Sequence, residues 1–332
     1  MDRDVDPVVP GATPDGGRIA VLLMAYGTPR TPDEIEPYYT DIRRGRPPTP
    51  ELLAELVARY DAIGGISPLA ARTEAQRAAL QAALDARAPG RFEVVLGLKH
   101  ADPKIEAAVD ELTGRGVRRI VGLVLAPHYS AYSVGQYLDR ARAAAEPHGI
   151  SVDGVESWAV EPALVAFLTA SVRERLAGLP SGSRVLFTAH SLPERILSTG
   201  DPYPAELRAT AAAVADAADL ADAQWSVAWQ SAGRTPEPWL GPDILAVIRE
   251  LGADAVPGVL VCACGFVADH LEVLYDLDVE ASRVAAEAGV AFARTKCVND
   301  DAAVLGALAD RVVALVDAAD TGAADTGVAE PS

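Results

Sequence analysis

A histidine that ends an apolar run is the residue of this sequence best placed to do chemistry. The run 184–187 is continued by Thr188 and Ala189 to His190, and the Ser-Leu-Pro that follows indicates the turn into a helix. In an open parallel sheet, ligands bind beyond the carboxyl ends of the strands. His190 is therefore placed to act as a base or as a metal ligand. The alternative is a hydrogen-bonded histidine with a purely structural role.

Polar residues collect at the ends of other apolar runs as well. Tyr26 follows the first run, His100, His128 and His270 stand at or just beyond the ends of later ones, and His148 lies in a loop. Strand ends are where α/β proteins build their ligand sites. The placement of these residues therefore indicates a functional site rather than four unrelated core histidines.

A line of carboxylates follows the last of these strand ends. Glu272, Asp276 and Glu280 are four residues apart, so they share one face of the helix predicted over 269–288, for which Asp269 is a plausible N-cap. Like charges at this spacing repel by a few tenths of a kcal/mol per pair. One interpretation is a solvated acidic face. The other is a ladder of oxygen ligands that guides a divalent cation to the strand ends, where carboxylate and imidazole together suit Fe²⁺ or Zn²⁺ better than Ca²⁺.

A small basic cluster contrasts with the acidic chain around it. Arg43, Arg44 and Arg46 stand close together and Arg59 precedes Tyr60, in a protein of formal net charge −18. Guanidinium groups bind carboxylates through two parallel hydrogen bonds. The cluster therefore suggests a ligand with carboxylate arms, and the alternative is that these arginines are solvent-exposed or form internal ion pairs.

Strands that alternate with helices would position these residues. Apolar runs predict strands over 19–24, 92–98, 119–125, 152–158, 184–187, 225–229, 256–262 and 291–294. Helical patterns fall at 32–42, 51–60, 67–86, 105–112, 132–145, 162–176, 205–221, 242–251, 269–288 and 301–316. Such alternation predicts an α/β protein with parallel sheets and right-handed crossovers. The count suits two Rossmann-like lobes with a cleft between them, although no glycine-rich phosphate loop follows any strand.

The composition supports a globular protein with two lobes. The chain has 332 residues, half of them apolar and 23 % charged. Its net charge of −18 disfavours binding to nucleic acid or to an acidic membrane surface. No apolar run approaches the ~20 residues of a membrane span and no signal peptide is evident, so we expect a cytoplasmic protein. Residues 1–16 and 318–332 are acidic, rich in small residues, and expected to be disordered tails.

Nine segments of the sequence, spread over about residues 18–316, form a recognisable set. They are 24–29 (MAYGTP), 38–45 (YYTDIRRG), 64–69 (GGISPL), 97–100 (GLKH), 125–128 (LAPH), 189–193 (AHSLP), 201–204 (DPYP), 229–231 (WQS) and 265–276 (GFVADHLEVLYD). Together, and in family order, these segments resemble the ferrochelatase family. The sequence is most similar to the coproporphyrin III ferrochelatases of Gram-positive bacteria, of the actinobacterial kind in its alanine-rich composition.

The resemblance implies a chelatase-like fold and a monomer. The first lobe would comprise residues 17–157, joined by the last helix (about 300–317) returning to it, and the second lobe residues 158–299. The implied reaction is insertion of Fe²⁺ into coproporphyrin III with release of two protons, a lyase reaction of haem biosynthesis. It needs no redox change and no organic cofactor. Coproporphyrin III and Fe²⁺ would be the partners, together with other haem-pathway enzymes.

The resemblance also assigns roles to residues. His190 matches the metal-site histidine that binds iron or accepts pyrrole protons, and Glu272 matches its acidic partner. Tyr26 matches the residue that ligates iron from the opposite face of the product. The other matching positions line the porphyrin pocket or form an outer Mg²⁺ site. They are Arg43, Arg59, Tyr60, Ser67 and Tyr137 for the pocket, and Arg59, Asp276 and Glu280 for the outer site.

The cysteines depart from part of the family. Many actinobacterial members carry a [2Fe–2S] cluster on four cysteines, whereas this chain has three, Cys262, Cys264 and Cys297. Four thiolates are the usual requirement of such a cluster. We therefore expect none here. Three cysteines are also too few for a disulfide framework.

Three other functions compete with the leading one. A protoporphyrin IX ferrochelatase would satisfy two propionates instead of four, and Tyr26 with the several arginines favours coproporphyrin III. A sirohydrochlorin cobalt or nickel chelatase shares the fold, but the segments around His190 and Glu272 argue against it. A non-catalytic tetrapyrrole-binding or haem-delivery protein would not need both His190 and Glu272.

Overall fold

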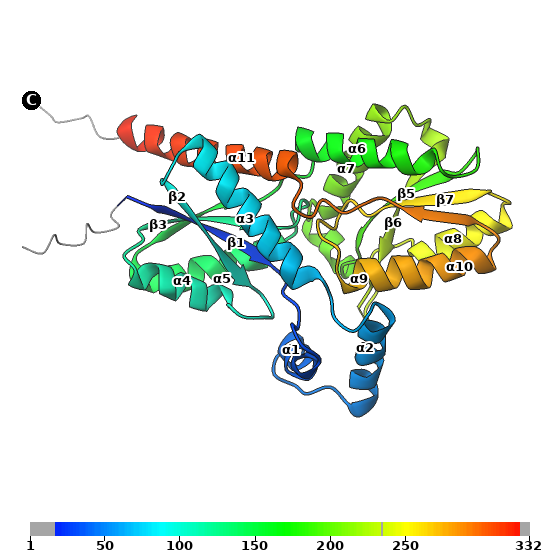
Figure 1. The fold of residues 1–332 in the computed structure, drawn as a ribbon, viewed down its shortest axis with the longest axis horizontal. Coiled ribbons are helices and arrows are strands. Elements are labelled where there is room, and N and C mark those ends of the chain that lie inside the picture. The colour runs from blue at the N-terminus through cyan, green and yellow to red at the C-terminus, as the bar shows by residue number, and fades with distance from the viewer. Residues whose placement is uncertain (1–16, 234, 326–332) are drawn as a thin grey trace, which may run out of the picture.

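Two parallel sheets organise the protein (Figure 1). The computed structural model describes residues 17–325 apart from residue 234, with side chains as far as Thr321. The first sheet has the order β2-β1-β3-β4, from β1 (Ile19–Ala25), β2 (Phe92–Leu98), β3 (Arg119–Val124) and β4 (Ser151–Val155). The second has the order β6-β5-β7-β8, from β5 (Arg184–His190), β6 (Trp225–Gln230), β7 (Gly258–Cys262) and β8 (Ala291–Arg294). Both sheets confirm the predicted α/β fold.

Helices connect the strands as expected, with short 3₁₀ turns at several junctions. The α-helices of the first half are α1 (Ile35–Ile42), α2 (Pro50–Ala62), α3 (Leu69–Arg87), α4 (Ile105–Gly114) and α5 (Val134–Ala145). Those of the second half are α6 (Pro162–Leu176), α7 (Tyr203–Ala217), α8 (Ile244–Ala253), α9 (Leu271–Val273), α10 (Ser282–Glu287) and α11 (Ala302–Asp325). The 3₁₀ turns are η1 (Pro32–Glu34), η2 (Glu146–His148), η3 (Glu194–Thr199) and η4 (Asp222–Gln224).

Local chemistry explains where several of these elements begin and how they pack. All seven residues of β1 are buried, as expected of a central parallel strand covered by helices on both faces. Thr49 caps α2, where its hydroxyl accepts a hydrogen bond from the Leu52 amide at 3.4 Å. Asp243 caps α8 in the same way, through two backbone amides. Helices and strands therefore begin close to where the sequence predicts them.

The two sheets share one hydrophobic core. A single cluster of buried side chains includes Leu80 and Leu84 of α3, Phe187 of β5, Leu207 of α7 and Leu308 of α11. Two smaller clusters cover the outer faces, one beneath α4 and α5 and one beneath α8 and α10. We propose the segment 156–161 as the boundary between the lobes, because β4 ends before it and α6 begins after it. The lobes are thus distinct as sheets but joined as a core.

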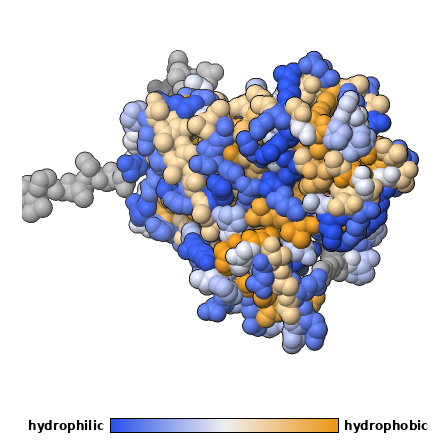
Figure 2. Space-filling view, turned by 45° about the vertical axis from the view of Figure 1, so that its right-hand side comes forward, coloured by the Kyte–Doolittle hydropathy of each residue, from blue (hydrophilic) through white to orange (hydrophobic). Residues whose placement is uncertain are grey.

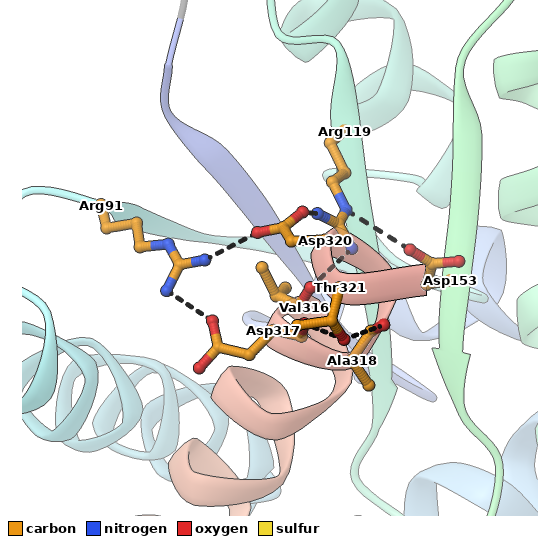
Figure 3. A network of polar contacts seen from close by, with 8 residues as sticks. All are labelled: Arg91, Arg119, Asp153, Val316, Asp317, Ala318, Asp320 and Thr321. Carbon is orange, nitrogen blue, oxygen red and sulfur yellow. Dashed lines mark hydrogen bonds and ion pairs between the residues drawn. The ribbon is translucent and has the colours of Figure 1, made fainter. Parts of the chain in front are cut away.

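Helix α11 returns from the second sheet to the first and lies against α3 (Figure 1). The helix continues to Asp325. The prediction of a disordered tail from residue 318 is therefore wrong for residues 318–325. Ion pairs hold this last part of the helix (Figure 3). Arg91 contacts Asp317 at 2.9 Å and Asp320 at 3.1 Å, and Arg119 contacts Asp320 at 2.5 Å. The tails 1–16 and 326–332 lie outside the described residues.

Helices α1 and α2 project away from the two sheets, and α2 contacts the helical segment that follows β7 (Figure 1). Hydrophobic side chains gather where this projection meets the rest of the molecule (Figure 2). Among the helices of residues 17–325, none is both long enough and apolar enough to cross a membrane.

Candidate functional site

The ring of His190 stands at the end of β5. The strand extends three residues beyond the predicted run, because His190 pairs with Gln230 of β6. One ring nitrogen, Nδ1, lies 2.5 Å from the carbonyl oxygen of Ser191. The other, Nε2, lies 3.6 Å from a carboxylate oxygen of Glu272, and each of these side chains is 35 % exposed. One nitrogen is therefore anchored, and the other faces an acidic partner and open space.

Glu272 lies between two histidines. Its second oxygen is 3.5 Å from Nε2 of His270, whose Nδ1 lies 3.0 Å from the carbonyl of Ala268. The sequence placed His270 at a strand end without a role of its own. Its position two residues before Glu272 was the available signal, but the extended backbone that brings the two side chains together could not be predicted.

The prediction that Asp269 is the N-cap of the helix over 269–288 is wrong, because the Asp269 side chain binds Asn299 and Arg294 instead of the helix amides. Asn299 donates a hydrogen bond to Asp269 at 2.8 Å, and Arg294 lies 3.3 Å from it. His270 occupies the cap position of α9, without a side-chain hydrogen bond to the helix. The turn before Glu272 is therefore held by contacts to β8 and to the segment after it.

Opposite charges shift the pKa values of the central pair. Burial by itself lowers the pKa of His190, but the Glu272 carboxylate and the Ser191 carbonyl outweigh it, so the pKa is raised. Burial by itself raises the pKa of Glu272, but His190 and then His270 hold it well below its usual range. Glu272 is therefore ionised at neutral pH and attracts cations.

The helix predicted over 269–288 contains a π-helical stretch at Leu274–Ala281, between α9 and α10. Its i→i+5 hydrogen bonds widen the turn. Glu272 and Glu280 both lie close enough to Asp276 for their charges to help raise its pKa. Burial is the main cause, and the pKa of Asp276 reaches about 6. The predicted acidic line is therefore present, on a helix of another kind.

Arg59 connects α2 to this acidic line. Its guanidinium lies 3.7 Å from Asp276 and 4.7 Å from the ring centre of Tyr275. The other Asp276 oxygen accepts a hydrogen bond from Ser231 at 2.5 Å. Arg59 thus forms an internal ion pair, one of the alternatives for the arginines. In the part of the chain that the structure describes, no three His, Cys, Asp or Glu side chains are arranged to hold a metal ion together.

Three tyrosines of the first lobe face the same region. Tyr26 follows β1, keeps 42 % of its surface exposed, and stacks on His100 at 4.6 Å between ring centres. Tyr60 on α2 and Tyr137 on α5 are 1 % and 5 % exposed. Desolvation is the main cause of a raised pKa in all three, and the charge of Glu272 adds to it. Both lobes therefore contribute side chains within electrostatic reach of Glu272.

Two predicted pocket residues are tied to their own segments. Arg43 ends α1, donates to the carbonyl of Arg46 at 3.2 Å, and lies 5.6 Å from the ring centre of Tyr39. Ser67 is 3 % exposed and accepts a hydrogen bond from the Leu69 amide at 3.2 Å, which starts α3. The contacts of these two residues account for local structure, and their part in ligand binding remains a proposal.

The sequence reasoning missed Lys99, which immediately follows β2. Its amine donates to Gln136 at 2.8 Å and lies 5.1 Å from the ring centre of Tyr137. Burial, followed by the charges of Arg140 and Arg44, lowers its pKa to about 8. Lys99 adds positive charge beside the tyrosines, and its place at a strand end was the signal that could have found it.

The expectation that His128 belongs to the site is wrong. Its ring is 2 % exposed, and Nε2 lies 2.9 Å from the hydroxyl of Thr210. Burial lowers the pKa of His128 to about 3, so it is neutral and structural. His100 contacts Asp41 at 2.7 Å, and His148 contacts Asp110 at 3.4 Å.

Two remaining features of the described residues are the cysteines and a cavity. All three cysteines are buried, Cys262 and Cys264 in the shared core and Cys297 in the core beneath α8 and α10. A cavity of about 800 Å³ is lined by β8, the segment 295–301 and residues of α6 and the π-helix, but by none of the predicted site residues. Neither feature contributes a group to the region around Glu272.

The two-lobed fold has counterparts among solved structures. The solved structure of SirB from Bacillus subtilis with Fe³⁺ aligns with 90 % of this chain and 95 % of its own, with a TM-score of 0.52 at 12 % identity. At this identity the likeness shows the fold alone. The ferrochelatase family model matches residues 18–315, and the chain belongs to the ferrochelatase family.

Curated relatives are similar over most of their length. The "Coproporphyrin III ferrochelatase" of Halalkalibacterium halodurans is 46 % identical over 287 residues, which are 85 % of this chain and 92 % of the relative. That of Oceanobacillus iheyensis is 45 % identical over 288 residues, with the same coverage. The "Ferrochelatase" of Herpetosiphon aurantiacus is 43 % identical over 297 residues, or 88 % of this chain and 97 % of the relative. The protein is thus an enzyme, a lyase that inserts a metal ion.

Proposed function

We propose that this protein inserts Fe²⁺ into coproporphyrin III and releases two protons. The observation that carries the proposal is the carboxylate of Glu272, held between His190 and His270 at 3.6 and 3.5 Å and facing the tyrosines of the first lobe. The printed names of the two relatives at 45 and 46 % identity support the choice of porphyrin.

Each member of the pair has a chemical task in this reaction. Nε2 of His190 accepts the two pyrrole protons one after the other and passes each to solvent, and Glu272 stabilises the imidazolium that forms each time. The ionised Glu272 also draws the hydrated Fe²⁺ towards the histidines and, with His190, replaces part of its water shell. Tyr26, on the first lobe, ligates iron from the opposite face of the product. The chemistry requires only proton transfer and ligand exchange, so no redox change or organic cofactor enters it.

The arms of the porphyrin would bind at the polar rim. Arg43, Arg59 and Lys99 supply positive charge, and Tyr60, Ser67 and Tyr137 supply hydroxyl groups for the four propionates. Binding through groups remote from the pyrrole nitrogens can be used to bend the macrocycle and expose those nitrogens. A ligand with four carboxylates suits these cationic and hydroxyl groups, which stand in an otherwise acidic protein.

The finer expectations complete the proposal. Asp276, Glu280 and Arg59 would hold a hydrated Mg²⁺ at an outer site, where the carboxylates supply oxygen ligands of the kind Mg²⁺ prefers. We also propose an enzyme without a [2Fe–2S] cluster, because the chain has three cysteines and such a cluster usually needs four thiolates. We further propose a cytoplasmic monomer that exchanges its tetrapyrrole substrate and product with neighbouring enzymes of haem synthesis.

Anaerobic absorbance spectroscopy tests the proposal. Fe²⁺ is added to the wild type, to His190→Ala and to the control His148→Ala, each with coproporphyrin III or protoporphyrin IX. We expect metallation of coproporphyrin III by the wild type and the control, and a loss of about 100-fold or more in His190→Ala. Preference for protoporphyrin IX would overturn the substrate. Binding of both porphyrins without metallation would overturn the assigned chemistry.

A further inference from the structure

Tyr203 contacts the backbone of His190, although the proposed chemistry gives it no part. It is the first residue of α7 and is 7 % exposed. Its hydroxyl donates a hydrogen bond to the carbonyl oxygen of His190 at 3.0 Å. Tyr203 lies in the segment 201–204 (DPYP), one of the segments that resemble the family. The contact links this segment to the central histidine.

The carbonyl of His190 needs such a donor because the sheet ends there. β5 pairs with β7 only as far as Phe187, and its pairing with β6 stops at His190 itself. The amide of the same peptide group, on Ser191, donates to the carbonyl of Gln230 at 2.7 Å. Tyr203 and Gln230 therefore hold the two sides of the peptide between His190 and Ser191. A buried carbonyl without a partner would be costly.

The orientation of this peptide determines the orientation of the His190 ring. Nδ1 of the ring lies 2.5 Å from the carbonyl oxygen of Ser191, the residue that the peptide carries. If the peptide turns, that carbonyl moves, and Nε2 moves relative to Glu272. The hydroxyl of Tyr203 thus acts on His190 through the backbone, without touching the ring.

The ring of Tyr203 is itself fixed on both sides. Its centre lies 5.5 Å from that of Trp229 in β6 and 6.1 Å from that of His128, which it meets at 76°. Edge-on and tilted aromatic contacts of this kind favour a defined geometry. Trp229 directly precedes Gln230. Tyr203 therefore packs against the neighbour of Gln230, the other residue that binds the His190–Ser191 peptide.

The start of α7 is also joined to the first lobe. Hydrogen bonds connect the residues around Tyr203 with the segment 128–131, which follows β3. They run from Ser130 Oγ and from the Ala131 amide to Asp201, both at 2.9 Å, from the Tyr129 amide to Glu206 at 2.6 Å, and between His128 and Thr210 at 2.9 Å. The first lobe and the His190 peptide therefore share one anchor.

We propose that Tyr203 is a positioning residue, which holds the His190 ring opposite Glu272 and ties that orientation to the position of the first lobe. The inference rests on the proposed role of His190 in metal insertion. The inference also accounts for the buried His128 and for the segment 201–204. His128 packs against the ring of Tyr203, and the segment places Tyr203 at the start of α7. The first lobe, which carries Tyr26 and Arg59, is thereby linked to the His190 ring of the second lobe.

The variant Tyr203→Phe removes the hydroxyl and keeps the ring. We expect its kcat for Fe²⁺ insertion to fall about 10-fold, with KM and Kd for coproporphyrin III within about twofold of the wild type. At one fixed pH, the ring resonance of His190 in a proton–carbon NMR spectrum should shift or broaden; it is assigned by its loss in His190→Ala. The matched control is Tyr132→Phe, which removes a hydroxyl that accepts a hydrogen bond from Arg195 at 3.3 Å.

The two readouts separate the possible failures. An unchanged kcat in Tyr203→Phe, or a lower kcat with an unmoved His190 resonance, would overturn the positioning role. The same changes in Tyr132→Phe would overturn it too, since the effect would then belong to any lost tyrosine hydroxyl. If the wild type fails to metallate coproporphyrin III, the proposed function fails, while the NMR comparison still tests the link between Tyr203 and His190.

Discussion

At the scale of single residues, the state of the site depends on one carboxylate. Glu272 raises the pKa of His190 and is itself kept ionised by His190 and His270. Histidine accepts a proton only in its neutral form, so the same charge that stabilises the protonated product also raises the pH at which His190 becomes available. A higher pKa makes His190 a stronger base, but it also leaves a smaller fraction of His190 neutral at a given pH.

The variant Glu272→Gln separates these two effects. Activity should fall in the wild type as the pH drops through the raised pKa of His190, because the ring is then already protonated. Removing the negative charge lowers that pKa, so the acid limb should move to lower pH, while the plateau kcat falls about 100-fold. The pH dependence of kcat under anaerobic conditions measures both. Glu287→Gln, whose carboxylate pairs with Arg283 on the exposed side of α10, is the control. If the acid limb of the pH profile does not move in Glu272→Gln, that limb belongs to a group other than His190.

Residue patterns alone could find His190 but could not separate it from His128. Both histidines end an apolar run, and both follow a small residue. What distinguishes them is the element that covers each one: α7 packs over His128, whereas His190 faces Glu272. That difference depends on contacts between residues about 80 positions apart, which local sequence does not contain.

At the scale of elements, the acidic line Glu272, Asp276 and Glu280 shows that residue spacing can predict a helix but not the type of helix. A spacing of four residues predicts one helical face, and the charges of Glu272 and Glu280 do reach Asp276. The same spacing is compatible with an α-helix or a π-helix, so the sequence could not distinguish the two. The π-helical stretch packs against α2 and α8, which come from distant parts of the chain, and local sequence does not contain these contacts.

Asp276 on this π-helix should cost stability when it is ionised. Its pKa of about 6 lies above the ~3.9 of an unfolded aspartate, so the folded state binds more protons between these values. Stability should therefore fall as the pH rises through this window. Asp276→Asn should increase the free energy of unfolding at pH 7.5 by roughly 1–2 kcal/mol, with little gain near pH 4, and should slow iron insertion.

Urea unfolding at the two pH values measures this effect. The control is Asp278→Asn on the same helix, because Asp278 is exposed and already paired with Arg294 at 2.6 Å. It should not become more stable at pH 7.5. A destabilised Asp276→Asn at that pH would show that the pair with Arg59 outweighs the cost of burial.

At the scale of the whole molecule, one core cluster joins both sheets, and α11 contributes to it. The sequence predicted two lobes and most of α11, because these depend on alternating apolar patterns. It did not predict the last part of α11, residues 318–325 (AADTGAAD), which has no large apolar side chain. That part is held by Arg91 and Arg119, which precede it by some two hundred residues.

A shared core predicts that the two lobes unfold together. Far-UV circular dichroism reports on both lobes, and fluorescence reports on the four tryptophans, all of which follow residue 157. In urea the two signals should change in one transition. Leu308→Ala in α11 should lower the free energy of unfolding by about 2–4 kcal/mol and shift both signals equally. Two separate midpoints would show that the lobes are independent.

The return of α11 affects how the protein is made. The first sheet is complete once β4 has been synthesised, yet part of its cover, α11, is among the last residues to leave the ribosome. The whole second lobe is translated in between, which takes on the order of ten seconds at ~5–20 residues per second. During that interval α3 already packs against β2, but the part of its apolar surface that α11 covers lacks this partner. The nascent protein therefore exposes that surface until its last helix closes the first lobe.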